Sequence, residues 1–236
     1  MNDKNKSDDA INKNSSETPT DKVSKLNSMN ALSQYFKSAA SKREGRVIPP
    51  LENWHPEQVA DMDLTIKANG EWWHEGSHMT RESLVRLFAT ILWKEENNGS
   101  VAYFLKTPVQ KLRIQVEDAP LLINDVGIVH EAGKCWLEFT TTTGDVVRLD
   151  DEHPIQLRAY TIKSPDDHES TKVNESTEEN TQIRPYMMVR NGLKALIGRN
   201  TFYHLTEIGE LTEQNGETIL TLQSGGNSYS LSMPSA

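Results

Sequence analysis

The chain has 236 residues, enough for one large domain or two small ones. Its 25 Lys and Arg against 34 Asp and Glu give a formal net charge of -9, which argues against nucleic acid as a partner. The one cysteine, Cys135, excludes an internal disulfide and a multi-cysteine zinc site, as expected in a reducing compartment. The start leads into no apolar run, and no stretch of about 20 apolar residues follows, so we expect a cytoplasmic protein that makes no membrane span.

Two segments are too polar to contribute to a core. Residues 1–47 hold nine Lys and Arg against six Asp and Glu with few apolar residues, and they are predicted to form a disordered or partly helical tail. Residues 164–182 hold six carboxylates and one lysine. We predict that they form an acidic loop inserted into the second half of the chain.

Residues 48–118 are predicted to form the first of two related motifs. Leu64–Ile66, the Asn69–Gly70 turn and Trp72–Trp73 indicate a β-hairpin. A helix capped by Thr80 should follow, because its apolar residues lie three and four apart as far as Leu92, and Asn97-Asn98-Gly99 should end it. Strands are expected over residues 101–106 and 112–117.

Residues 119–236 are predicted to repeat the order of these elements. The hairpin is expected over residues 136–149, the helix over Arg190–Ile197 and an aromatic strand over Phe202–Thr206. The second helix is expected because Arg190–Ile197 matches Arg81–Phe88 in the form Arg-x-x-Leu-x-x-Leu-apolar. Turns at 215–216 and 225–226 indicate a C-terminal β-meander. One helix per hairpin-helix-strand copy predicts an α+β protein with mainly antiparallel sheets.

Several short phrases occur in a fixed order and spacing between residues 48 and 208. They are Pro49-Pro50, Trp54-His55-Pro56, Asn69-Gly70-Glu71-Trp72, Leu84-Val85-Arg86-Leu87-Phe88, Thr107-Pro108-Val109, Val116-Glu117-Asp118-Ala119-Pro120, Pro185-Tyr186 and Val189-Arg190. In these phrases the chain resembles a family of bacterial proteins, found in proteobacteria, that is called domain of unknown function 1285. The resemblance implies an N-terminal α/β roll followed by a C-terminal β-rich roll, and no established activity. Gln110 and Leu121 depart from it, since a Glu and an aromatic residue are expected there.

Residues 74–78 spell the His-Glu-x-x-His pattern of zinc proteases. That chemistry needs a helix, which places both imidazoles on one face beside the metal. Here a hairpin strand ends at Trp73 and Gly76 interrupts the motif, so we interpret His74 and His78 as part of a polar turn. A metal site at these two histidines is the alternative.

Adjacent carboxylates stand at the boundary between the two motifs, at Glu117 and Asp118. Neighbours on a strand point to opposite faces, so the two cannot act on one substrate as an acid and base pair. We expect structural roles at this junction, in which one carboxylate pairs with an arginine or caps a turn. Trp72 and Pro120 are assigned structural roles in the same region.

Arg81 and Arg190 open the two predicted helices at equivalent places. Two arginines beside helix N-termini could converge on one phosphate or carboxylate, and they are our candidate ligand-binding residues. The alternative is a pair of structural ion pairs, with Glu117 or Asp118 as candidate partners.

These observations favour a non-catalytic regulatory or binding module, as found in signal transduction. Its ligand is expected to be an anionic small molecule or a protein, and no cofactor is expected. A metal-dependent hydrolase using His74 and His78 is one alternative. A scaffold that acts by self-association, as a homo-oligomer, is the other.

Overall fold

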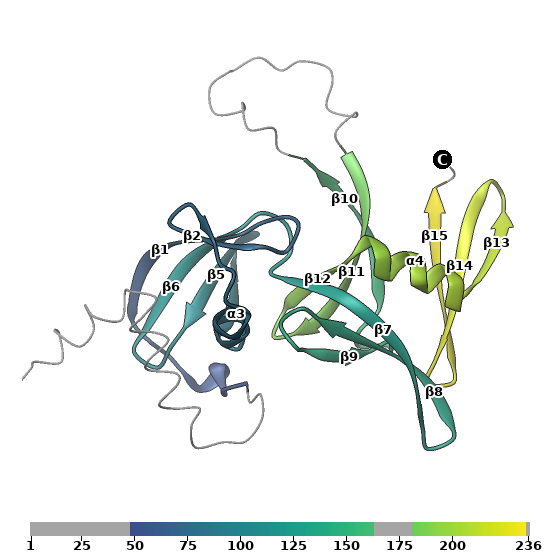
Figure 1. The fold of residues 1–236 in the computed structure, drawn as a ribbon, viewed down its shortest axis with the longest axis horizontal. Helices are drawn as coiled ribbons and strands as arrows, with labels where there is room; N and C mark the ends of the chain where they lie inside the picture. The colour runs from purple at the N-terminus through teal and green to yellow at the C-terminus, as the bar shows by residue number, and fades with distance from the viewer. Residues whose placement is uncertain (1–47, 163–180, 235–236) are drawn as a thin grey trace, which may run out of the picture. The chain divides into compact units, whose positions relative to one another are not determined.

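The computed structural model describes residues 48–162 and 181–234, which form fifteen β-strands and two α-helices (Figure 1). None of the helices within these residues is long and apolar enough to cross a membrane. The prediction for residues 1–47 and most of that for the acidic loop fall outside the described residues.

The first sheet has six strands in the order β3-β2-β1-β6-β5-β4. The expected hairpin at Asn69–Gly70 is confirmed, and Gly70 adopts a φ of +86°, which its missing Cβ permits. Helix α3 (Glu82–Ala89) joins the two halves of the sheet and buries Phe88 and Ala89. The strands are β1 (Gln58–Ile66), β2 (Trp72–His74), β3 (Ser77–His78), β4 (Leu92–Asn97), β5 (Ser100–Lys106) and β6 (Gln110–Val116), and the 3-10 turn η2 (Leu51–Asn53) precedes them.

Helix α3 is shorter than the sequence predicted. It ends at Ala89, and the residues expected to complete it form strand β4 instead. Asn98 and Gly99 have φ values of 51° and 79°, so they make the tight turn of the β4–β5 hairpin rather than a helix C-terminus.

The second sheet also has six strands, in the order β10-β11-β12-β7-β8-β9. Its strands are β7 (Leu121–Glu131), β8 (Lys134–Thr141), β9 (Val146–Arg148), β10 (Ile155–Thr161), β11 (Thr181–Arg190) and β12 (Leu193–Ile197). In each of the two sheets, two three-stranded meanders meet at the centre, where the first strand of one pairs in parallel with the last strand of the other. Strands β7 to β12 therefore repeat β1 to β6 in order.

A third sheet, of three antiparallel strands, follows helix α4 (Arg199–Ile208). It comprises β13 (Glu210–Gln214), β14 (Glu217–Ser224) and β15 (Asn227–Pro234), joined by the two turns that the sequence predicted. Gly225 at the second turn has a φ of +63°, and a Cβ added there would lie 2.4 Å from the Trp136 ring. Helix α4 contacts β7, β13 and β14.

The prediction of an α+β fold is wrong, because the described residues are mostly β and their two large sheets are mixed. Segment 190–197, expected to be a helix, contains a turn and then β12. Asn191 and Gly192 have φ values of 47° and 72°, as in a tight turn, and every second residue of β12, from Leu193 to Ile197, is buried, as in a strand.

The predicted hairpin-helix-strand repeat is also wrong in its elements, although the architecture is repeated. Segment Phe202–Thr206, expected to be a strand, lies within α4, and Leu205 is its fully buried residue. Helix α3 lies between the two meanders of the first sheet, whereas α4 follows the second sheet. Matching Arg81–Phe88 to Arg190–Ile197 therefore compared a helix with a strand.

Candidate functional site

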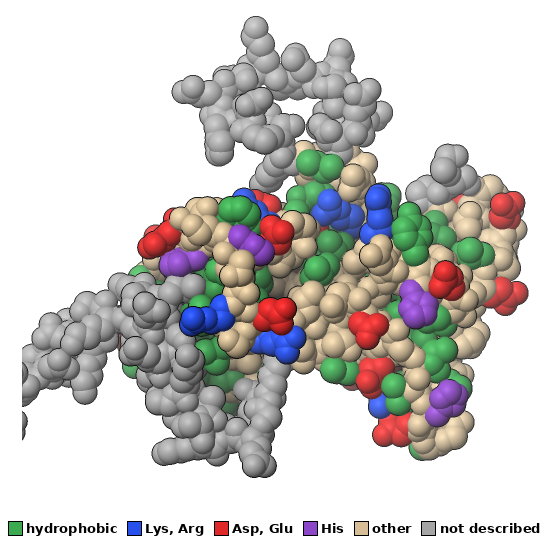
Figure 2. All heavy atoms as spheres, in the orientation of Figure 1, with side chains coloured by type: hydrophobic (Ala, Val, Ile, Leu, Met, Phe, Trp, Pro, Cys, Tyr) green, Lys and Arg blue, Asp and Glu red, His purple; other side chains and the backbone are tan. Residues whose placement is uncertain are grey.

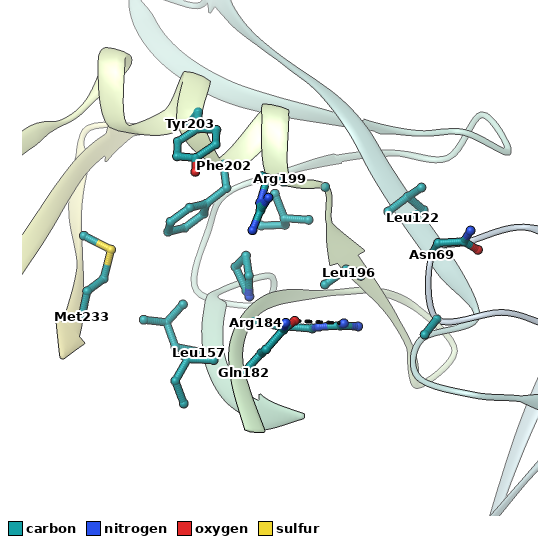
Figure 3. Close-up of a pocket in the computed structure, with 15 residues that line it drawn as sticks. Asn69, Leu122, Leu157, Gln182, Arg184, Leu196, Arg199, Phe202, Tyr203 and Met233 are labelled. Carbon is teal, nitrogen blue, oxygen red and sulfur yellow. Dashed lines mark hydrogen bonds between the residues drawn. The ribbon is translucent and has the colours of Figure 1, made fainter. Parts of the chain in front are cut away.

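A pocket of about 830 Å³ opens where β10, β11, β12, α4 and β15 approach the turn between β1 and β2 (Figure 3). This volume lies within the range of small-molecule sites. Figure 3 shows Arg199, Arg184 and Gln182 near the middle of the pocket. The lining residues are Ala68, Asn69, Leu122, Leu157, Gln182, Ile183, Arg184, Pro185, Leu196, Ile197, Gly198, Arg199, Phe202, Tyr203 and Met233.

Most of the lining is apolar. Leu157 from β10, Phe202 from α4 and Met233 from β15 provide an aliphatic and aromatic wall on one side of the arginines (Figure 3), and Ile183 of β11 also lines the pocket. Ile183 is 51% exposed, unusual for an isoleucine beside a core. On the face shown in Figure 2, hydrophobic and Lys or Arg side chains lie next to each other over the region of β10, β11 and α4.

Arg199 is the first residue of α4, directly after Gly198, whose backbone caps the helix without a side-chain hydrogen bond. A Cβ at Gly198 would lie 3.0 Å from the carbonyl oxygen of Ile123, so this close approach of α4 to β7 favours glycine. Arg199 is exposed, and none of the ion pairs between described residues involves it. Its guanidinium is therefore available to a ligand.

Arg184, the second arginine in the lining, is already paired with Asp118. Its Nη1 lies 3.0 Å from Asp118 Oδ2, and the Asp118 side chain is only 3% exposed. Its Nη2 donates to Gln182 Oε1 at 3.2 Å, and the guanidinium stacks 3.8 Å from the centre of the Tyr160 ring. These contacts hold Arg184 in the pocket wall.

Asp118 is the centre of a buried polar cluster. The Tyr186 hydroxyl lies 2.7 and 2.8 Å from its two oxygens, and Lys194 Nζ lies 3.7 Å away. Burial, and then the hydrogen bond to Asp118, raise the pKa of Tyr186 well above its usual value. Burial lowers the pKa of Lys194, an effect that the charge of Asp118 partly opposes.

A second buried ion pair joins Arg190, at the end of β11, to Asp145. Arg190 Nε donates to Asp145 Oδ1 at 2.7 Å, and the side chains are 12% and 3% exposed. Thr141 and Thr143 donate to the other carboxylate oxygen. Arg190 Nη2 also donates to the backbone carbonyl of Ala89, at the end of α3. This environment is that of a structural ion pair.

The structure does not give Arg81 and Arg190 equivalent positions. Arg81 is the exposed N-cap residue of α3, and Arg190 is half-buried beside Asp145. Neither residue lines the pocket.

The His-Glu-x-x-His residues form the β2–β3 hairpin rather than a helix. Glu75 and Gly76 occupy its turn with φ values of 48° and 70°, and His74 pairs with Ser77 across it. His74 Nδ1 lies 2.6 Å from the carbonyl oxygen of Asp63, and His78 is exposed. Across residues 48–162 and 181–234, no group of three or more His, Cys, Asp or Glu side chains is placed to hold a metal ion.

The junction residues have separate contacts. Glu117 accepts hydrogen bonds from Lys67 Nζ at 2.7 Å and from the backbone N–H of Ala68 at 3.0 Å, and so supports the β1–β2 turn. Trp72 and Pro120 are buried. The two adjacent carboxylates thus face different partners, since Asp118 contacts residues of β11 and β12 instead.

Sequence reasoning missed the pocket arginines. Arg199 fell just beyond the helix expected to end at Ile197, and Arg184 fell beside the acidic loop. One available signal was the three-residue spacing of Phe202, Leu205 and Ile208 between two glycines, which is typical of a helix face. A helix placed there would have put Arg199 in its first turn.

Comparison with protein families matches both halves of the chain. Residues 49–119 match the N-terminal domain of a domain of unknown function, DUF1285, and residues 120–231 match the C-terminal domain of the same family. The chain belongs to the DUF1285 family. The boundary between the two matched domains lies directly after Asp118 and Ala119.

Two solved structures of DUF1285 proteins are similar to this chain. The protein from Silicibacter pomeroyi is 31% identical, with a TM-score of 0.60 over 84% of this chain and 94% of its own. The protein from Shewanella baltica is 27% identical, with a TM-score of 0.41 over 62% of this chain and 91% of its own. Comparison with curated proteins gave no match.

Proposed function

We propose that this DUF1285 protein is a non-catalytic binding module whose pocket takes a small organic anion with an apolar body. The observation that carries the proposal is the combination, in one cavity, of an apolar wall and the available guanidinium of Arg199. An apolar pocket with a few polar groups that converge on one region is typical of small-molecule sites. Guanidinium binds carboxylates and related anions through paired N–H donors.

The residues that line the pocket support binding rather than catalysis. Within residues 48–162 and 181–234, the lining includes no carboxylate, imidazole, thiol or aliphatic hydroxyl side chain. General acid and base catalysis and covalent catalysis depend mostly on such groups. The lining does supply hydrogen-bond donors from arginine and carboxamide groups, which fix the orientation of a bound acid.

The first test compares octanoate with 1-octanol, which has the same chain length without the charge. Isothermal titration calorimetry should detect octanoate binding, and octanoate should raise the melting temperature by the ordinary linkage of ligand binding to folding. Arg199→Ala should weaken octanoate binding by about tenfold or more, the typical effect of losing a charge-assisted hydrogen bond.

Arg81→Ala is the matched control. It removes an exposed arginine beside the N-terminus of the other α-helix, outside the pocket lining. Octanoate binding should be the same as in the wild type. If 1-octanol binds as tightly as octanoate, or if Arg199→Ala binds octanoate like the wild type, the proposed function is wrong.

A further inference from the structure

The proposed pocket contains two arginines, and the charge of its ligand depends on whether both are available. This inference rests on the proposed function and concerns the same site. Among the residues that the structure describes, Arg184 and Arg199 are the charged side chains of the lining, and no carboxylate lines it. Two available guanidinium groups would favour a dianion such as a phosphate monoester. One would favour a monoanion.

Asp118 neutralises Arg184. The carboxylate lies 3.0 Å from Arg184 Nη1, and the exposed fractions are 3% for Asp118 and 20% for Arg184. Such a pair interacts strongly because water screens it little. Asp118 does not line the pocket, so it cancels the charge of Arg184 from behind the wall without occupying the ligand's space.

The nearby cations outside the lining do not change the number of positive charges that the pocket offers to a ligand. Lys194 lies 3.7 Å from Asp118 and is 30% exposed, and burial lowers its pKa. Arg158, opposite Arg184 in the β10–β11 pairing, is exposed and donates to Gln156. Arg158 is screened by water and salt, and Lys194 is partly buried but lies outside the lining, so each contributes less to a ligand than a lining residue does.

We infer that the pocket selects an apolar molecule with a single negative charge, bound by Arg199, and that Asp118 sets this selectivity by neutralising Arg184. A second negative charge on the ligand would enter a partly desolvated site without a cation to balance it, which is unfavourable. Asp118 is a positioning residue in this scheme, since it acts through Arg184 and does not touch the ligand.

Octyl sulfate and octyl phosphate make a suitable pair of probes. They share a chain and a tetrahedral head group, but at pH 8 the sulfate carries one charge and the phosphate close to two, because its second pKa is about 6. Calorimetry on the wild type should show octyl sulfate binding about fivefold or more tightly than octyl phosphate. A preference of the wild type for octyl phosphate would overturn the inference.

Asp118→Asn should reverse the preference, because it releases the charge of Arg184 while keeping the size of the side chain. Octyl phosphate should then bind about tenfold more tightly than to the wild type, and octyl sulfate should gain less. Asp145→Asn is the matched control, since Asp145 is also 3% exposed and paired with an arginine of β11 that lies outside the lining. Equal effects of the two Asn variants would overturn the inference.

Arg184→Gln provides an independent test if Asp118→Asn does not fold. Because the charge of Arg184 is already balanced, its loss should weaken octyl sulfate binding by less than about threefold, whereas Arg199→Gln should weaken it by about tenfold or more. Equal losses would show that Arg184 acts as a free cation and would contradict the inference. Failure of the wild type to bind either probe would instead refute the proposed function and this inference with it.

Discussion

Replacing Arg190 by alanine should destabilise the protein much more than the same change at Arg81. Loss of Arg190 leaves Asp145, 3% exposed, without the guanidinium that lies 2.7 Å from its Oδ1. Removing one partner of a buried ion pair typically costs about 3–5 kcal/mol. Thr141 and Thr143 still donate to Asp145 Oδ2, so we expect the loss of stability to lie at the lower end of this range, about 3 kcal/mol.

Thermal unfolding followed by circular dichroism measures this difference. For a chain of this size 1 kcal/mol corresponds to about 2–4 °C, so Arg190→Ala should lower the melting temperature by about 6–12 °C. Arg81→Ala removes an exposed side chain and should change it by less than about 2 °C. The melting temperature of Arg190→Lys should lie between those of the two alanine variants, because an ammonium keeps the charge but lacks the paired donors of the guanidinium.

The reasoning would be refuted by an Arg190→Ala protein that melts within about 2 °C of the wild type. A double-mutant cycle with Asp145→Ala gives an independent check, because the two losses should be strongly non-additive if the residues form one pair. Additive losses would mean that the contact between Arg190 and Asp145 contributes little.

Three further changes test other features. Because the pKa of Tyr186 is raised, the folded protein keeps a proton that the unfolded chain loses above about pH 10. The free energy of unfolding, measured in urea, should therefore fall above that pH, and it should fall less steeply in Tyr186→Phe. Gly225→Ala should cost about 2–3 kcal/mol, since φ is +63° and the new Cβ meets the Trp136 ring; an unchanged melting temperature would contradict this. Elemental analysis should find no stoichiometric zinc, and one zinc per chain that is lost in His74→Ala would show the opposite.

Local sequence signals identified the hairpins. Asn69–Gly70, Asn215–Gly216 and Gly225–Gly226 each lie in the turn that was predicted, because a glycine, and asparagine at position 215, adopts positive φ at little cost. The first helix was also found, although its end was placed too late. Turn chemistry is short-range, and it therefore survives in any tertiary context.

The second helix could not be placed in the same way. Residues 190–197 carry apolar residues at spacings that fit both a helix and a strand, a common ambiguity in short apolar runs. Two pairings make this segment a strand: β12 pairs with β11 across the Asn191–Gly192 turn, and it pairs in parallel with β7, which comes from a distant part of the chain. The predicted α+β class was wrong for this reason.

By itself the sequence determined the negative charge and the hairpins with glycine turns, since these depend on composition or on neighbours in the chain. Only the tertiary structure decided which arginines are available. Arg184, Arg190 and Arg199 are alike in sequence, but folding pairs the first two with the buried carboxylates of Asp118 and Asp145 and leaves the third exposed at the pocket. The charge that an arginine offers to a ligand depends on the carboxylate beside it, and these carboxylates are 45 and 66 residues away along the chain.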